Sequence, residues 1–221
     1  MQTDIFLSFR FAFEEVRPRI EEIHSVLKSD NPLSASPVDA AIREIMPFLE
    51  DNDGITGGYI LRKADRLRLN TGAKIGGYLK DAAYLALFTC TAGKLFTELT
   101  GRYNENGDYL EAFVADTIGS LTVEKAMDKI QAQLEREMQA AGLQISNRYS
   151  PGYCDWPVSG QRELFDQMGE IPIAISLTKS CLMLPIKSVS GIIGVGAHVR
   201  KHPYACQVCK FENCTYRKLI Q

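Results

Sequence analysis

Apolar residues recur with a helical period over much of this chain, most clearly between Asp108 and Ala141. Apolar side chains return there every three or four residues, Asp108 is a typical N-cap, and Gly142 is typical of a helix end. The pattern therefore predicts one long amphipathic helix. The same period predicts shorter helices over Glu14 to Lys28, Pro37 to Leu49 and Ser159 to Met168.

A segment from Asp81 to Thr100 is apolar on nearly every side. This composition is typical of a buried central helix, which Gly101 would end. Cys90 lies inside the segment, so we expect it to be a buried structural thiol.

Alternation of apolar and polar residues predicts strands in the remaining segments. These strands are expected over Tyr59 to Leu69, Lys74 to Tyr78, Ile173 to Leu177 and Ser190 to Val199. Residues 5 to 13 are rich in aromatic side chains and fit either a first strand or the start of a helix. Helices early and strands late favour an α+β fold over an alternating βαβ one. Gly194-Val195-Gly196 lacks the third glycine and the following helix of a dinucleotide-binding loop.

Composition excludes several classes of protein. The chain has 221 residues, of which 45% are hydrophobic and 24% charged, which is typical of a soluble globular protein. A net charge of −2 argues against a general binder of nucleic acid or of membrane surfaces. The sequence shows neither a secretory signal at its start nor an apolar run of the ~20 residues that a spanning helix needs. We therefore expect a cytoplasmic protein.

Unusual backbone and side-chain chemistry gathers between Arg148 and Pro157. Pro151 and Gly152 predict a turn at which the backbone is accessible. Tyr153 and Trp156, the single tryptophan of the chain, lie on either side of Cys154-Asp155. The stretch fits a binding loop, and the alternative is an ordinary turn at the surface.

Three ordered blocks of sequence resemble the activation domain of cobalamin-dependent methionine synthase. Arg148 to Tyr153 is similar to the Arg-x-x-x-Gly-Tyr loop of that family. Leu177 to Gly191 resembles its Leu-Thr-x-Ser, Met-x-Pro and Ser-Val-Ser-Gly pattern. Leu87 to Gly93, followed by Asp108-Tyr109 and the long helix, resembles its central helical part. The resemblance spans residues 57 to 196 and is far more specific than a lone glycine motif.

The resemblance implies long helices packed around a bent antiparallel sheet that holds S-adenosylmethionine, so that oxidised cobalamin can be reduced and remethylated. Arg148 would pair with the ligand carboxylate. Ser150 and Gly152 would offer backbone contacts, and the Tyr153 ring would line the pocket near the sulfonium. The segment from Ser188 through Ser190 to Gly191 would form the neighbouring strand edge.

The chain also departs from the family pattern. Residues 1 to 50 offer no match for an acidic ligand contact, and Glu124 on the long helix is the remaining candidate. Modules for homocysteine, folate and cobalamin are missing from the sequence. We therefore expect a free-standing activation subunit. Its partners would be a separate corrinoid-binding methionine synthase or methyltransferase subunit that presents cobalamin, and an electron donor such as flavodoxin or ferredoxin.

The last residues of the sequence depart most from the family pattern, because Cys206, Cys209 and Cys214 form a C-x2-C-x4-C spacing. Three thiolates at this spacing can face one centre, and thiolates select iron–sulfur clusters or zinc. We hypothesise such a metal centre, with iron–sulfur favoured because a reductive partner could use an electron relay. The fourth ligand is left open among Cys154, Cys181, His202 and water. The alternative is a reactive or partly disulfide-linked tail.

These features divide the chain into an N-terminal segment (1–55), an S-adenosylmethionine-binding core (56–200) and a cysteine-rich tail (201–221). The leading function is reactivation of a corrinoid protein. The alternatives are a stand-alone S-adenosylmethionine-dependent corrinoid methyltransferase and a redox or metal module on the same fold.

Overall fold

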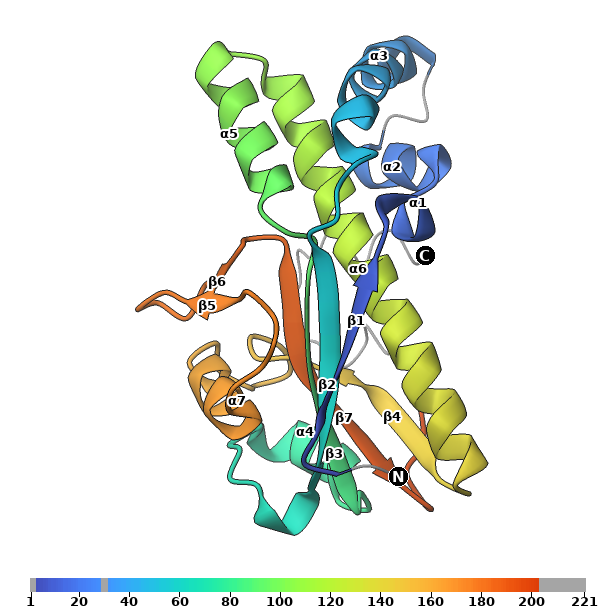
Figure 1. The fold of residues 1–221 in the computed structure, drawn as a ribbon, viewed down its shortest axis with the longest axis vertical. Coiled ribbons are helices and arrows are strands. Elements are labelled where there is room, and N and C mark those ends of the chain that lie inside the picture. Colours follow the sequence, from blue (N-terminus) through green and yellow to red (C-terminus); the bar gives the residue numbers. More distant parts are fainter. Residues whose placement is uncertain (1–2, 29–31, 203–221) are drawn as a thin grey trace.

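The computed structural model describes residues 3–28 and 32–202 and shows helices packed on an antiparallel sheet (Figure 1). The main sheet has five strands in the order β1-β2-β3-β7-β4. Their bounds are Phe6–Phe11 (β1), Ile55–Lys63 (β2), Tyr84–Thr91 (β3), Ser188–Gly196 (β7) and Gln144–Tyr149 (β4). All neighbouring strands are antiparallel. The predicted α+β class is confirmed.

One long helix, α6 (Tyr109–Ala140), crosses one face of this sheet and contacts β2, β3, β4 and β7. Shorter helices gather around its first half, and α4 and α7 lie on the other side of the sheet (Figure 1). Their bounds are Phe13–Val16 (α1), Ile20–Leu27 (α2), Pro32–Leu49 (α3), Gly72–Leu79 (α4), Leu95–Asn106 (α5) and Gly160–Met168 (α7). A small hairpin of β5 (Ser176–Leu177) and β6 (Met183–Leu184) projects from the body.

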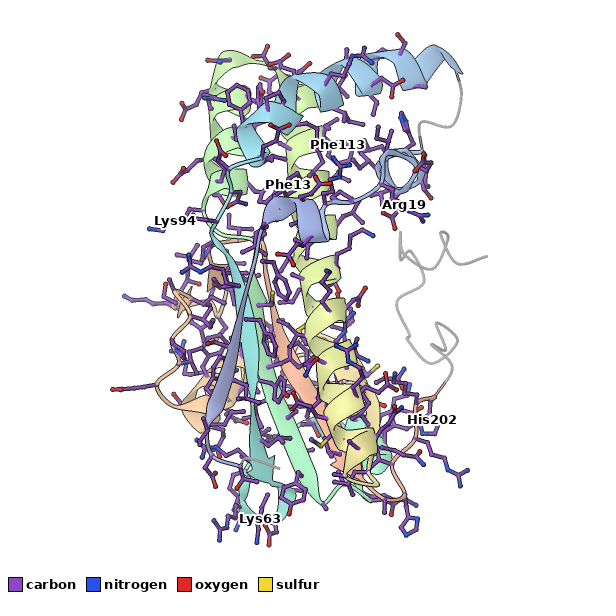
Figure 2. The ribbon with its side chains drawn as sticks, turned by 45° about the vertical axis from the view of Figure 1, so that its right-hand side comes forward. Phe13, Arg19, Lys63, Lys94, Phe113 and His202 are labelled. Carbon is purple, nitrogen blue, oxygen red and sulfur yellow. The ribbon has the colours of Figure 1, made fainter. Side chains whose placement is uncertain are left out.

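The sheet has a hydrophobic core on each face because successive strand residues point to opposite sides. On β3, Ala86 and Phe88 face α6, whereas Leu85 and Leu87 face α4 and α7. Phe13, at the junction of β1 with the helical end (Figure 2), joins the core on the α6 side. Cys90 is completely buried in that core, and burial raises the pKa of its thiol to about 12. The prediction of a buried thiol at Cys90 is confirmed, and a thiol with a raised pKa in an apolar core is unreactive.

The predicted helix over Asp81 to Thr100 is wrong. The segment forms β3, then a turn, then α5. A central strand buried on both faces is apolar on every side, as a buried helix is, so the pattern could not separate the two. The predicted strand over Lys74 to Tyr78 is also wrong, because these residues belong to α4, whose Ile75 packs against the sheet.

Other predictions hold with shifted ends. The helices α6 and α7 are confirmed, and residues 6–11 are a strand. The predicted helix from Glu14 to Lys28 is two helices, and α3 begins before Pro37. The strand expected to start at Tyr59 is β2, which starts earlier, and the last strand is β7. Between Ile173 and Leu177, only the final two residues pair as β5.

No helix within the described parts of the chain combines the length and apolar character needed to cross a membrane. The proposed division into three segments stays a prediction. Strand β1 and helices α1 to α3, from the first segment, contribute to the same core as β3 and α6.

Candidate functional site

Arg148 lies near the end of β4, and a β-bulge decides which face it occupies. Ile145 pairs with Val195, and Arg148 pairs with Ile193, so β4 contains one residue more than β7 between these two pairs. Ile145, Ile193 and Val195 all belong to the core under α6. Paired residues share a face, so the extra residue brings Arg148 to the α6 side, where strict alternation would have turned it away.

On that side the Arg148 guanidinium meets two carboxylates of α6. Its Nη2 forms an ion pair with Asp128 Oδ1 at 2.8 Å and donates a hydrogen bond to Glu124 Oε2 at 3.2 Å. The Arg148 side chain is 19% exposed, whereas Glu124 and Asp128 expose 52% and 64% of theirs. Nη1 of Arg148 is buried and has no hydrogen-bond partner among the described residues. One side of this guanidinium fork therefore has an unused donor.

The pKa of the Glu124 carboxyl is raised above its ordinary value of 4.5. Partial burial of the carboxyl is the main cause, the positive charge of Arg148 opposes it, and the negative charge of Asp128 adds to it. A local excess of negative charge thus remains beside Arg148, and a cationic group placed there would relieve it.

A second cation lies further along the same flank of α6. Lys187, next to the start of β7, is 11% exposed; its Nζ lies 2.6 Å from Asp116 Oδ1 and donates to Ser120 Oγ at 2.9 Å. We call the α6 residues that meet these two cations the acidic flank: Asp116, Ser120, Glu124 and Asp128. They repeat every four residues, so they lie on one side of the helix. The two cations contact the helix about 12 Å apart along its axis.

The loop after β4 is a compact turn held by a buried tryptophan. Gly152 N donates to Trp156 O at 2.7 Å, and Trp156 N donates to Tyr153 O at 2.9 Å. Trp156 is 1% exposed and packs on Gly160, where a Cβ atom would lie 2.2 Å from its Nε1. Tyr153 stays 64% exposed. Gly152 has φ +96°, a conformation that favours glycine. The anchored loop therefore presents an exposed aromatic ring.

The two serines predicted on β7 are engaged within the protein. Ser190 is buried and accepts a hydrogen bond from Gln161 Nε2 of α7. Ser188 Oγ donates to Pro185 O at 2.6 Å and lies 2.8 Å from Thr91 Oγ1. Both point away from the acidic flank. Pairing with β4 ends at Ile192, so the backbone edge of β7 from Ser188 to Gly191 lies beyond the end of β4.

Ser150 lies beside Gly191 at the end of β4, on the α6 side. A Cβ atom on Gly191 would lie 2.9 Å from Ser150 Oγ and 2.8 Å from Phe88 Cζ. The structure thus brings Arg148 and Ser150 together at one edge of the acidic flank, with Gly152 and Tyr153 in the loop that follows.

Only part of the predicted metal site lies among the described residues. Cys154 lies in the loop, half-buried, with φ +51°. Cys206, Cys209 and Cys214 lie outside the described residues. Within residues 3–28 and 32–202, no group of histidine, cysteine, aspartate or glutamate side chains is arranged to hold a metal ion.

The sequence pointed to Arg148 and Glu124, which the structure brings into contact. It did not point to Asp128, Lys187 or Asp116, which form ion pairs on the same flank of α6. A usable signal was present, because acidic and hydroxyl side chains repeat at intervals of four along the predicted long helix. Their cationic partners could not be read from the sequence, because they come from distant strands.

Comparison with known proteins identifies the family and the fold of the chain. Residues 77–218 match the family model described as vitamin B12 dependent methionine synthase, activation domain. No curated protein matches the chain. A solved structure described as the MetH reactivation domain bound to AdoHcy is similar, with a TM-score of 0.63 and 14% identity, over 91% of this chain and 81% of that one. The structural likeness shows a shared fold, and the sequence match covers more than half of the chain. The chain belongs to the family of activation domains of vitamin B12-dependent methionine synthases.

Proposed function

We propose that this chain binds S-adenosylmethionine between the acidic flank of α6 and the loop from Ser150 to Pro157. In this role it supports the reductive remethylation of cobalamin held by a corrinoid-binding partner. Family membership supports a part in methionine synthase reactivation. The similar MetH reactivation domain is described as bound to AdoHcy, the demethylated form of the proposed ligand.

The observation that carries the proposal is the unused side of the Arg148 guanidinium. Its Nη2 contacts Glu124 and Asp128, while its Nη1 is buried and has no acceptor in the described part of the chain. A buried donor without a partner costs free energy. A ligand carboxylate that displaced the atoms covering Nη1 would supply the acceptor in a charge-assisted hydrogen bond.

The positive charges of the ligand fit the surroundings of Arg148. S-adenosylmethionine carries an ammonium and a sulfonium group beside its carboxylate. Glu124 and Asp128 are both at least half exposed, so they can reach a cation as well as Arg148. The exposed Tyr153 ring offers an aromatic face to a sulfonium. The site therefore suits a ligand with mixed charge.

The bound ligand supplies an electrophilic methyl group, and the residues of this chain orient it. Arg148 would fix the carboxylate end, and the loop anchored by Trp156 would hold Tyr153 in place. Cobalamin and the reductant, a flavodoxin or ferredoxin, would come from separate partners. No described residue is proposed as a catalytic group.

Calorimetric titration with S-adenosylmethionine tests the proposal. Arg148→Ala should weaken binding by about 10- to 100-fold, because a hydrogen bond to a charged group contributes about 1.5–3 kcal/mol. Arg10→Ala is the matched control, since Arg10 is 70% exposed on β1, at the opposite edge of the sheet. It should leave the affinity unchanged. Absence of binding by the wild type, or equal affinity in Arg148→Ala, would refute the site.

A second comparison separates recognition of the sulfonium charge from recognition of the rest of the ligand. Glu124→Gln keeps the shape of the side chain and removes its charge. The substitution should weaken the binding of S-adenosylmethionine more than that of S-adenosylhomocysteine, because only S-adenosylmethionine carries the sulfonium charge. Equal losses for both ligands would place Glu124 away from that charge.

The iron–sulfur or zinc centre on Cys206, Cys209, Cys214 and Cys154 stays a prediction. Elemental analysis of protein purified without oxygen tests it directly. Stoichiometric iron with sulfide, or zinc, that is lost when these cysteines are replaced by serine would support it. Absence of all three elements from the wild type would remove it.

A further inference from the structure

The flank of α6 opposite the acidic flank forms a groove with the edge strand β1. The groove has a volume of about 330 Å³ and is lined by Phe9 and Phe11 of β1 and by Lys129, Ala132, Gln133 and Arg136 of α6. Phe9 is half-buried, and its ring lies nearly parallel to that of Phe11, with centroids 6.5 Å apart. We call this space the β1 groove. It has an aromatic floor and a basic wall.

No strand of the described chain covers the backbone edge of β1 beside this groove, in contrast to the other edge of the sheet. On β4, a bulge interrupts the strand, and Asn147 exchanges hydrogen bonds with the backbone of His202 at 2.9 and 2.8 Å. β1 pairs with β2 in continuous register and has no strand on its other side within the described chain. An edge without a bulge, a proline or a cover is a template for strand addition.

The basic wall of the groove, Lys129 and Arg136, has no acidic partner among the described residues. Lys125, one turn before Lys129 on α6, pairs with Glu22 of α2 at 2.9 Å. Lys129 and Arg136 form no ion pair with any residue that the structure describes. The nearby Glu137 already accepts hydrogen bonds from Tyr59 Oη at 2.8 Å and Gln133 Nε2 at 2.7 Å. Arg136 Nη2 donates to the neutral Gln133 Oε1 at 2.6 Å. Neither cation is therefore neutralised by a described residue, and both can pair with an acidic ligand.

We propose that the β1 groove binds an extended acidic segment of a partner protein, which adds to the sheet as a strand beside β1. Lys129 and Arg136 are about 10.5 Å apart along the helix axis. Side chains on one face of a strand repeat at about 6.8 Å. Two long, flexible cations can close the difference, so acidic residues at alternate positions of the segment would meet both.

Charge also selects against a second copy of this chain as the occupant. Two β1 edges joined by a two-fold axis would bring the basic walls of both copies toward the same interface. Like charges would then face each other, because neither wall supplies a carboxylate to pair with them. An acidic segment from another protein removes this conflict.

Titration of the ¹⁵N-labelled chain with a capped heptapeptide tests the proposal. The probe carries glutamate at its third and fifth positions and threonine or valine elsewhere. We expect the amide signals of β1 to shift on binding and affinity to fall with added salt. The double variant Lys129→Glu, Arg136→Glu should weaken binding by about tenfold or more, because two attractive charge pairs are replaced by repulsive ones. The double variant Arg43→Glu, Lys80→Glu reverses two other exposed positive charges. It is the charge-matched control and should bind the peptide normally.

A second probe tests strand pairing itself. The same peptide with alternate amides N-methylated keeps its charges but cannot continue the sheet, so it should lose binding. Equal binding of the methylated peptide would show that the peptide binds through non-specific charge attraction, and it would overturn the proposal. Shifts confined to residues outside β1, or concentration-dependent dimerisation of the chain through β1, would overturn it as well.

Discussion

Gly191 shows how closely β7 and β4 approach at the end of the site. A Cβ atom at this position would lie 2.2 Å from Tyr149 O and 2.8 Å from Phe88 Cζ. The first of these atoms belongs to the backbone, which cannot move away as a flexible side chain can. The glycine of the Ser-Val-Ser-Gly block is therefore required by packing within the protein, independently of any ligand.

Gly191→Ala should lower the free energy of unfolding by about 1–3 kcal/mol, the usual cost of overpacking a tight core. Urea denaturation measures the change. Gly101→Ala is the control, because Gly101 lies within α5 and a Cβ atom there would meet nothing within 4 Å. That variant should be neutral or up to about 1 kcal/mol more stable, since alanine favours helix over glycine. Equal stability of both variants would contradict the packing argument.

At the residue scale, the sequence was informative where chemistry is local. Arg148, Gly152 and Tyr153 form one short block, so a resemblance could locate them together. Asp128 and Lys187 could not be located this way, because their roles depend on contacts made across the fold. The face occupied by Arg148 depends on a bulge, and no alternation pattern reports an extra residue in a strand.

Among the elements, α6 was predictable over nearly its whole length because a helix with one buried side repeats its pattern many times. β3 was not, because a central strand is apolar on both faces and too short to show a period. β4 was missed for another reason. It is six residues long, contains the bulge and leads directly into the loop, so its alternation never becomes regular.

Contacts between elements then fix the geometry of the site, and Lys187 is one such contact. It joins the segment that enters β7 to α6 through Asp116 and Ser120 while only 11% of its side chain is exposed. The resulting ion pair is shielded from water on the lysine side and half open on the aspartate side. It should therefore contribute more than an ordinary surface pair.

A double-mutant cycle of Lys187→Met and Asp116→Asn should give a coupling energy of about 1–2 kcal/mol. Lys201 and Glu135 form the control pair, at the similar distance of 2.7 Å but with 43% and 32% of the side chains exposed. Their cycle should give less than about 0.5 kcal/mol. A coupling energy no larger for Lys187 than for Lys201 would mean that the pair does not hold β7 against α6.

At the scale of the whole molecule, the two hydrophobic cores share the same strands. The core under α6 includes Phe13, Ile45 and Phe88, and therefore unites the N-terminal helices with the sheet. The core on the other face includes Trp156 and Leu87. Separation of the strands would open both cores together. The acidic flank and the β1 groove lie on the two sides of α6, so both depend on that packing.

Chemical denaturation should therefore show a single cooperative transition. Trp156, the only tryptophan, reports the core under α4 and α7 through its fluorescence, whereas far-ultraviolet circular dichroism reports mainly α6 and the helices around it. The two probes should give the same midpoint and the same dependence on denaturant, because strands shared by both cores couple their loss. S-adenosylmethionine at a hundred times its dissociation constant should raise the free energy of unfolding measured by both probes by about 2.7 kcal/mol. The reason is that a ligand of the folded state stabilises the whole cooperative unit. If fluorescence changed at lower denaturant than circular dichroism, the side carrying the loop would unfold by itself. Ligand binding would then protect that part of the molecule alone.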